Sequence, residues 1–232
     1  MHVPDGFIDA PTSLAAGAVA VVGIGLCLRG AHRELDERSA PLAGLVAAFV
    51  FAAQMLNFPV ASGTSGHLLG GVLAAILIGP WSGALAVTTV LLVQALLFAD
   101  GGLTALGVNV VNMAFVTILV GYPIFRTIVR VLPRRSVVPI AAAVAALVSV
   151  PVASLSFVLL FAIGGTTDLS LGAVTTAVVS VHVLIGIGEA VITGLTVASV
   201  MAVRPDLVFG ARGLLAPVKL RLHSPPTTAG AR

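Results

Sequence analysis

Long apolar runs separated by short polar stretches make up almost the whole chain. Because about 20 apolar residues cross a bilayer, these runs predict about seven transmembrane helices, at residues 11–28, 40–58, 68–79, 81–99, 103–125, 137–163 and 172–203. The third run is short and stops at Gly79-Pro80. Three alternatives stay open for it: a tilted helix, a buried helix, or a helix that is continuous with the next run. The last run is long enough to tilt, or to begin outside the hydrocarbon.

The connections between these runs are too short to hold a soluble module. We therefore expect one transmembrane domain over residues 1–205, with the candidate chemistry in its N-terminal segment. The remaining residues, 206–232, are polar and are expected to form a loose cytoplasmic tail.

Composition supports the membrane assignment and excludes several functions. Charged residues make up 9% of the chain and hydrophobic residues 58%, whereas soluble domains carry about 25% charged residues. The fold class is therefore an all-α, polytopic membrane bundle. The net charge of +3 comes without a basic patch interleaved with aromatic residues, so nucleic acid is not an expected partner. The single cysteine, Cys27, lies in an apolar run and allows neither an internal disulfide nor a thiolate cluster.

Enzymatic activity is not expected. The chain has no Walker A motif, so it cannot hydrolyse ATP by itself. It also lacks an HExxH pair and a nucleophile–base set, and no residue is assigned a catalytic role.

The basic residues predict the orientation in the membrane. With the N-terminus outside and the C-terminus in the cytoplasm, the loops near 29–39 and 126–136 and the tail are cytoplasmic. All 12 basic residues then lie inside, in agreement with the positive-inside bias: Arg29, Arg33, Arg38, Arg126, Arg130, Arg134, Arg135, Arg204, Arg212, Lys219, Arg221 and Arg232. The N-terminus and the segment around 59–67 share the external side.

The opening MHVPDGF does not resemble a secretory signal peptide, because it has no basic start before an apolar run. It places His2 directly beside the α-amino group of Met1. The amine, the amide nitrogen of His2 and its imidazole Nδ1 can bind one metal in two fused chelate rings. Pro4 has no N–H, so such a chelate ends at His2.

A second histidine, His67, follows the Gly/Ser/Thr-rich stretch ASGTSG on the same side of the membrane. Its imidazole completes a square set of four nitrogen donors. Square-planar nitrogen ligation suits Ni²⁺ or Cu²⁺, and low-spin Co²⁺ also adopts it, whereas Ca²⁺ and Mg²⁺ prefer oxygen. With ordinary pKa values of about 6.5 for imidazole and about 8 for the amine, affinity should fall below about pH 6.5.

Ionisable residues inside predicted spans are functional candidates. His182 and Glu189 are seven positions apart and share one helix face, where they either support the fold or take part in coupling. Asn109 and Asn112 are expected to brace the external loops, as donors around the metal ligands. Asp100, in FADGG, is expected to form an external turn.

Further polar residues have ordinary explanations. Asp5 and Asp9 either cap the first helix or orient the N-terminal segment. His32 and His223 are expected to be solvated.

Four stretches closely resemble the CbiM/NikM family of cobalt- or nickel-specific substrate-binding (S) components of energy-coupling factor (ECF) transporters. They are MHVPDGF, NFPVASGTSGHLLGG, QALLFADGGLTALGVNVVNMA and IGIGEAVITG, and the resemblance runs from Met1 to about residue 205. In that family the metal is held by the terminal amine, by the amide and imidazole of the second residue, and by the histidine of SGH. The resemblance thus implies Met1, His2 and His67 as ligands and a seven-helix S component.

The same resemblance implies partners and a location. These are a transmembrane coupling subunit, two cytoplasmic ATPase subunits and a small accessory membrane subunit, in the cell membrane. A face of small residues, such as Ala43/Ala47 or Ala48/Ala52, lets helices approach closely in lipid and by analogy contacts the coupling subunit. The resemblance also implies a supply of cobalt for cobalamin biosynthesis.

Two functions from different classes follow. One is the metal-capturing subunit of an ATP-driven importer, with Co²⁺ or Ni²⁺ as transported substrate and no catalytic cofactor. The other is a self-sufficient metal channel or secondary carrier that uses Glu189 and His182 as its ion path. The ligands would be the same for cobalt and nickel, and cobalt is only slightly favoured.

Overall fold

The computed structural model describes residues 1–34, 40–56, 58–61 and 64–213. Of the expected tail, 206–232, only residues 206–213 are described; with Pro205 they include two short 3₁₀ turns, Pro205–Leu207 and Phe209–Ala211, and Val208 is fully buried, so this part is not loose. The rest of the tail lies outside the described residues, and so do His223, Arg38, Lys219, Arg221 and Arg232.

Helices follow the predicted apolar runs. They are α1 (Ala10–Ala31), α2 (Ala40–Gln54), α3 (Gly71–Ile78), α4 (Pro80–Leu97), α5 (Leu106–Val110), α6 (Thr117–Val131), α7 (Val137–Gly164) and α8 (Leu171–Val203). A π-helical segment, Val111–Val116, joins α5 to α6 in one continuous helix. Five of these are long and apolar enough to cross a membrane: α1, α4, the α5–α6 helix, α7 and α8. The expected helical, multi-pass class is confirmed.

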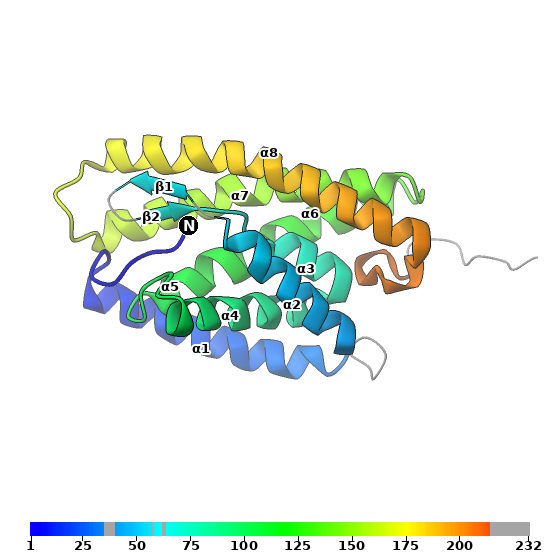
Figure 1. Ribbon diagram of the computed structural model, residues 1–232, viewed down its shortest axis with the longest axis horizontal. Helices are drawn as coiled ribbons and strands as arrows, with labels where there is room; N and C mark the ends of the chain where they lie inside the picture. The colour runs from blue at the N-terminus through cyan, green and yellow to red at the C-terminus, as the bar shows by residue number, and fades with distance from the viewer. Residues whose placement is uncertain (35–39, 57, 62–63, 214–232) are drawn as a thin grey trace, which may run out of the picture.

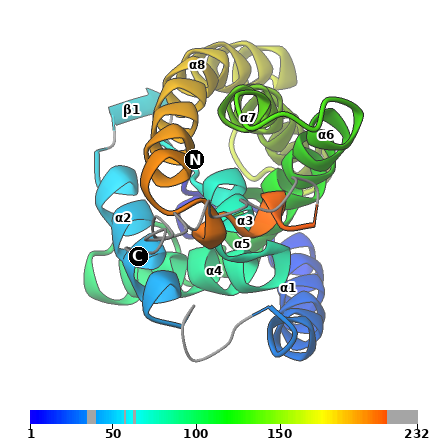
Figure 2. The same ribbon diagram turned by 90° about the vertical axis from the view of Figure 1, so that its right-hand side faces the viewer.

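The short third run forms a buried central helix. All eight residues of α3 are buried, and α2, α4, α6, α7 and α8 surround it (Figures 1 and 2). Eight residues rise only about 12 Å, so α3 alone does not cross a bilayer. Gly79 separates α3 from α4, and with φ +99° it turns the chain there.

The second predicted span, 40–58, was too long at its end. Helix α2 stops at Gln54, and β1 (Phe58–Ala61) pairs antiparallel with β2 (Thr64–Gly66), in the register Phe58↔Gly66, Pro59↔Ser65 and Ala61↔Thr64. The reason is Pro59, because a proline disfavours helical backbone at the residue before it. The stretch expected to be a loop is therefore a small hairpin beside α8 (Figure 1).

The fifth predicted span, 103–125, was also placed wrongly at both ends. Its helix runs from Leu106 to Val131, so Arg126 and Arg130 lie in α6 and not in the loop that was predicted to hold them. Long arginine side chains extend from a helix end into a polar environment, and Arg126 Nη1 donates to the carbonyl of Gly210 at 2.9 Å.

The two ends of the bundle differ in charge. The basic end, on the right in Figure 1, holds the α1–α2 and α6–α7 connections and the segment after α8. The described Arg residues lie there or in the helix turns that lead into those connections. The acidic end holds the N-terminal segment, the hairpin and the α4–α5 and α7–α8 connections, with Asp5, Asp9, Asp100 and Asp168.

At the basic end, a buried carboxylate caps α4. The α4 N-cap is Gly79, which has no capping side chain. Glu34, 7% exposed, instead accepts hydrogen bonds from the backbone N–H groups of Trp81 (3.3 Å) and Ser82 (2.7 Å). A Cβ at residue 79 would collide with this carboxylate, so Gly79 leaves the room that Glu34 occupies.

We predict that Glu34→Ala lowers the stability of the fold by about 1–2 kcal/mol, because two amides at a helix start lose their acceptor. Thermal unfolding in detergent measures this, and Arg33→Ala, at the exposed neighbouring position, is the control. Equal unfolding midpoints for the two variants would contradict the capping role.

Candidate metal centre

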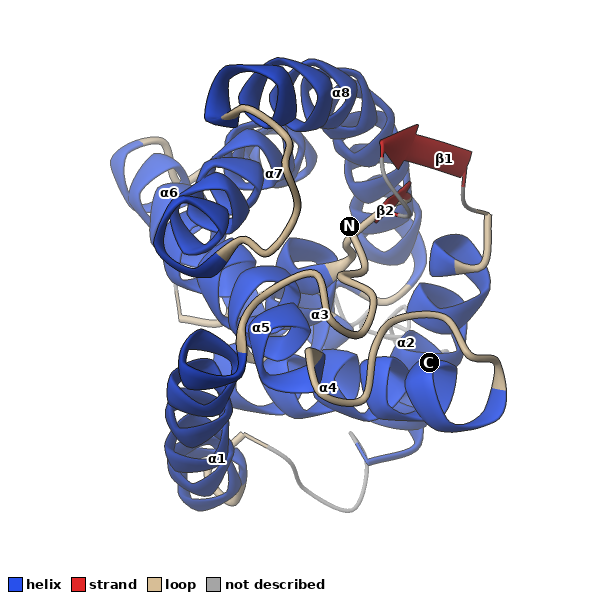
Figure 3. Ribbon diagram, turned by 90° about the vertical axis from the view of Figure 1, so that its left-hand side faces the viewer, coloured by secondary structure: helices blue, strands red, loops and turns tan. Residues whose placement is uncertain are grey.

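The N-terminal segment, Met1–Asp9, is threaded into the acidic end of the bundle. Met1 and His2 are each 3% exposed and Val3 is fully buried. The chain therefore begins in the interior, between β2, α3 and the α4–α5 connection (Figure 3). Since burial of a polar terminus is costly without compensating interactions, specific contacts must hold this segment in place.

Asn109 and the α4–α5 connection hold its first part. Asn109 Oδ1 accepts from the N–H of Val3 at 2.8 Å, and Asn109 Nδ2 donates to the Val3 carbonyl at 3.3 Å. The same carbonyl accepts from the N–H of Gly102 at 2.8 Å. A Cβ at residue 102 would collide with the backbone of Asp5, so glycine is needed for this close approach.

Two aspartates hold the rest of the segment, and each of the two expected roles is found. Asp5 orients it, since its Oδ1 accepts from the N–H (2.7 Å) and the hydroxyl (2.6 Å) of Thr104. Asp9 caps α1 by accepting from the N–H of Thr12 at 2.9 Å. Asp9 also donates its N–H to the carbonyl of Gly164 at 2.7 Å, at the end of α7.

Three of the predicted site residues come together at the start of the chain. The amino nitrogen of Met1 lies 2.5 Å from Nε2 of His67. The rings of His2 and His67 stack, with centroids 4.4 Å apart and planes inclined by 29°. His67 Nδ1 donates to the carbonyl of Leu68 at 2.7 Å, which leaves the lone pair of Nε2 directed at Met1.

Burial favours the neutral forms of these groups. Burial lowers the pKa of the Met1 amino group well below its ordinary value, and the negative charges of Asp100 and Glu189 oppose this only in part. Burial likewise lowers the pKa of His67 well below its usual range, and it lowers the pKa of His2 against the opposing effect of Asp100. Neutral amines and imidazoles present lone pairs, which is the state that a metal requires.

His2 also contacts a carboxylate. Its Nδ1 lies 3.0 Å from Oδ1 of Asp100, whose side chain is 16% exposed. Both residues line a cleft of about 410 Å³ that also includes Asp5. Nδ1 is the atom predicted to bind metal, so binding must replace this contact. Asp100 was predicted only as a turn residue, and nothing in the sequence signals its pairing with residue 2.

In the described ranges, no three His, Cys, Asp or Glu side chains group together in a way that could hold a metal ion. The centre predicted from the sequence differs from such a cluster, because two of its predicted donors are the terminal amine and a backbone amide.

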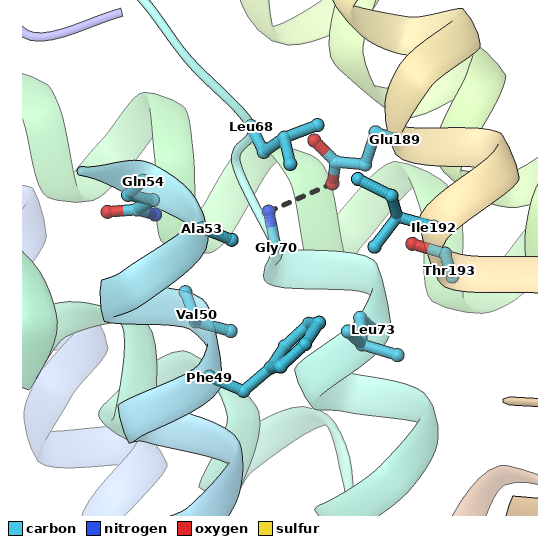
Figure 4. A pocket seen from close by; sticks show the side chains of 10 residues that line it. All are labelled: Phe49, Val50, Ala53, Gln54, Leu68, Gly70, Leu73, Glu189, Ile192 and Thr193. Atoms are coloured by element: carbon cyan, nitrogen blue, oxygen red, sulfur yellow. Dashed lines mark hydrogen bonds between the residues drawn. The ribbon is translucent and has the colours of Figure 1, made fainter. Parts of the chain in front are cut away.

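The remaining predicted residues differ in their contacts. Asn112, on the π-helical segment, is 1% exposed, and its side-chain atoms have no hydrogen-bond partner in the described part of the protein, so the expected bracing of the external loops is not found for this residue. His182 Nδ1 donates to the carbonyl of Val178, one turn earlier in α8, at 2.7 Å. Glu189 accepts from the N–H of Leu69. It also accepts from the N–H of Gly70, a hydrogen bond drawn in Figure 4. Both donors are close to His67 in the chain.

Gln54 is a buried residue near the site that was missed from the sequence. Gln54, fully buried at the end of α2, donates from Nε2 to the carbonyl of Leu69 at 2.7 Å. A glutamine in the apolar run FVFAAQ was the available signal.

Comparison with known proteins shows the family to which the chain belongs. Residues 2–207 match the family model CbiM, the cobalt uptake substrate-specific transmembrane region. A putative metal transport protein of Haloquadratum walsbyi is 41% identical, over 90% of this chain and 94% of its own. A putative fused nickel transport protein of Archaeoglobus fulgidus is 42% identical, over 90% of this chain and 68% of its own. The crystal structure of a truncated transition metal transporter superposes with a TM-score of 0.80, at 31% identity, and covers 87% of this chain and 99% of that one.

We predict that Asn109→Leu makes the Met1 amine accessible to acylating reagents. Two hydrogen bonds of roughly 1 kcal/mol each hold the segment, so the amine should react roughly 10- to 30-fold faster in the variant. Mass spectrometry of the N-terminal peptide measures the rate.

Asn112→Leu is the matched control, since the side chain of Asn112 forms no hydrogen bond to the segment within the described residues. An equal increase in both variants would mean that general loosening, and not loss of the Val3 contacts, exposes the amine.

Proposed function

Because the chain belongs to the CbiM family of cobalt uptake substrate-specific transmembrane regions, a family of metal transporters and not of enzymes, we propose that it is the substrate-binding component of an ATP-driven, ECF-type importer. It captures Co²⁺ or Ni²⁺ with nitrogen donors from Met1, His2 and His67. The metal is the transported substrate, and the proposal involves no catalytic cofactor.

The observation that carries this proposal is the contact between the Met1 amine and His67 Nε2 at 2.5 Å. Two nitrogen donors that bind one metal at right angles, each ~2.0 Å from it, lie roughly 2.8 Å apart. The observed pair is therefore close to the spacing of neighbouring ligands. The amide nitrogen and imidazole of His2 extend the set to four, which suits square-planar Ni²⁺ or Co²⁺.

The charge distribution supports capture of a cation from outside. We place the acidic end outside and the basic end in the cytoplasm, as the positive-inside bias favours. The cleft beside His2, with Asp5 and Asp100 in its walls, then opens to the exterior. Negative charge in a cleft raises the local concentration of cations.

The energy source has to come from partners, because the chain has no Walker A motif. We propose a transmembrane coupling subunit, two cytoplasmic ATPase subunits and a small accessory membrane subunit, all in the cell membrane. Of the two small-residue pairs, Ala48 and Ala52 lie on the exposed face of α2, whereas Ala43 and Ala47 pack against the core. Ala48 and Ala52 are therefore the pair available to a partner helix.

The alternative, a self-sufficient carrier with an ion path at Glu189 and His182, fits the geometry less well. Both carboxylate oxygens of Glu189 accept backbone N–H groups. The cavity beside it has a volume of about 10 Å³, room for about one water molecule. Metal uptake into liposomes by this chain alone, without ATPase subunits, would favour the alternative.

The donor set does not discriminate between cobalt and nickel. We propose cobalt, with cobalamin biosynthesis as its use, by a narrow margin. Metal analysis after loading with equal amounts of Co²⁺ and Ni²⁺ tests this choice without affecting the site assignment.

We predict that a protein with residues added before Met1 binds Ni²⁺ or Co²⁺ at least roughly 100-fold more weakly, because an acylated nitrogen has no basic lone pair. Loss of a direct ligand should exceed the 10- to 100-fold effect of removing an outer partner. The experiment uses a cleavable N-terminal extension, and titration in detergent measures affinity before and after cleavage.

Cleavage that restores a free Met1 should restore binding in the same preparation, which makes it the control. Intact mass establishes that Met1 carries the free terminus. Equal affinity with and without the extension would refute the assignment of the amine as a ligand.

The dependence on pH differs from the expectation based on ordinary pKa values. Protons compete with the metal only below the pKa of each donor, and burial lowers the pKa of Met1, His2 and His67. We therefore predict that affinity persists well below pH 6.5, and that binding at pH 7 releases about one proton, from the His2 amide. Calorimetry in buffers of different ionisation enthalpy counts these protons. Release of two or more at pH 7 would contradict a neutral metal-free centre.

A further inference from the structure

A short segment without regular structure, His67–Gly70, connects β2 to α3 and carries the histidine of the proposed metal site. Two long-range hydrogen bonds fix its end to α8. Oε2 of Glu189 accepts from the N–H of Leu69 at 2.6 Å, and Oε1 accepts from the N–H of Gly70 at 2.9 Å (Figure 4). Glu189 is 2% exposed, so its carboxylate depends on these amides.

The same peptide unit is held from the opposite side by α2. Gln54 Nε2 donates to the carbonyl of Leu69 at 2.7 Å, and Gln54 is fully buried. Leu69 thus offers its N–H to α8 and its carbonyl to α2. We name this arrangement the Leu69 clamp: Glu189, Gln54 and the backbone of Leu69 and Gly70.

The Leu69 clamp is tightly packed. Gly70 has φ +74°, and a Cβ there would collide with Val50 of α2. The cavity between the two sides, with walls that include Val50, Gln54 and Glu189, has a volume of only about 10 Å³. A buried carboxylate is costly to leave without its hydrogen-bond donors, so the segment follows α8 when α8 moves.

His67 is two residues before Leu69 and also donates to the carbonyl of Leu68 at 2.7 Å. The position of its Nε2 relative to the Met1 amine is therefore set through the clamp. Helix α8 runs on to Val203 at the basic end, where the segment Pro205–Leu207 packs against it. A displacement of α8 relative to α2 would be transmitted along this helix to His67.

We propose that Glu189 is a positioning residue, which together with Gln54 holds His67 against Met1, and that movement of α8 relative to α2 withdraws His67 and releases the metal. This inference rests on the proposed function, since it concerns the same metal centre. Glu189 does not contact the metal in this scheme but acts through the backbone of Leu69 and Gly70.

The test compares dissociation rates of Ni²⁺ from the full chain in detergent, by stopped-flow transfer to an excess of chelator. In Glu189→Gln, the side-chain amide oxygen still accepts one backbone N–H. The side-chain amide nitrogen is itself a donor, so the second backbone N–H loses its acceptor. We expect Ni²⁺ to dissociate roughly tenfold faster, in the range for partners that support ligands, while the absorption spectrum of bound Ni²⁺ keeps its nitrogen-ligand character. His67→Ala should change that spectrum, because it removes a ligand.

Thr193→Val is the matched control. Thr193 is 1% exposed and lies one turn further along α8, beside the same small cavity, and this variant should dissociate at the wild-type rate. Gln54→Leu breaks the clamp from the other side, so it provides the same test if Glu189→Gln does not fold. Faster dissociation in Gln54→Leu with an unchanged unfolding midpoint supports positioning over general stability.

Wild-type dissociation rates in both Glu189→Gln and Gln54→Leu, in a protein whose His67→Ala variant has lost binding, would overturn the clamp and leave the proposed function standing. Wild-type binding by His67→Ala would overturn the proposed function, and this inference with it.

Discussion

Burial of the α-amino group of Met1 is the constraint on which the rest of the site depends. A charged terminus is strongly disfavoured in a low-dielectric interior, so burial lowers the pKa of the amine, which lies 2.5 Å from Nε2 of His67. The contacts of Asn109, Asp5 and Asp9 with the N-terminal segment and its neighbours serve to keep that terminus inside. In the proposed function, this buried chain end is one of the metal donors.

His67, on the other side of the proposed site, is held by different elements from those that hold the N-terminal segment. His67 lies between the hairpin and the buried helix α3, and the peptide that follows it is bonded to both α2 and α8. The N-terminal segment, the other part of the site, is anchored to the α4–α5 connection, to α5 through Asn109 and to the end of α7. The contact between Met1 and His67 therefore joins two segments of the chain that are anchored to different elements.

The two ends of the bundle carry opposite charge, and the proposed mechanism uses both. Aspartates surround the entrance beside His2, whereas the described arginines lie at the far end, around the cytoplasmic connections in the proposed orientation. The carboxylates at the entrance and the nitrogen donors within the site have separate roles in this proposal. In the proposed mechanism, the carboxylates would concentrate cations of any kind, and the nitrogen donors would select those that accept square-planar ligation.

The sequence by itself determined the helical membrane class, the positions of the seven apolar segments and the pairing of His2 with His67 as candidate ligands. Hydrophobic runs and a histidine beside an amine are local features, and local features can be read from sequence. The hairpin and the true ends of two helices were missed, because Pro59 and the arginines of α6 act at boundaries where apolar runs give a weak signal. Only the tertiary structure decided that Asp100 contacts His2, that Gln54 and Glu189 hold the Leu69 peptide, and that burial lowers the pKa of Met1, His2 and His67. Those contacts join residues 15 to 120 positions apart through backbone N–H and C=O groups, which every residue except proline possesses and no sequence pattern therefore reveals.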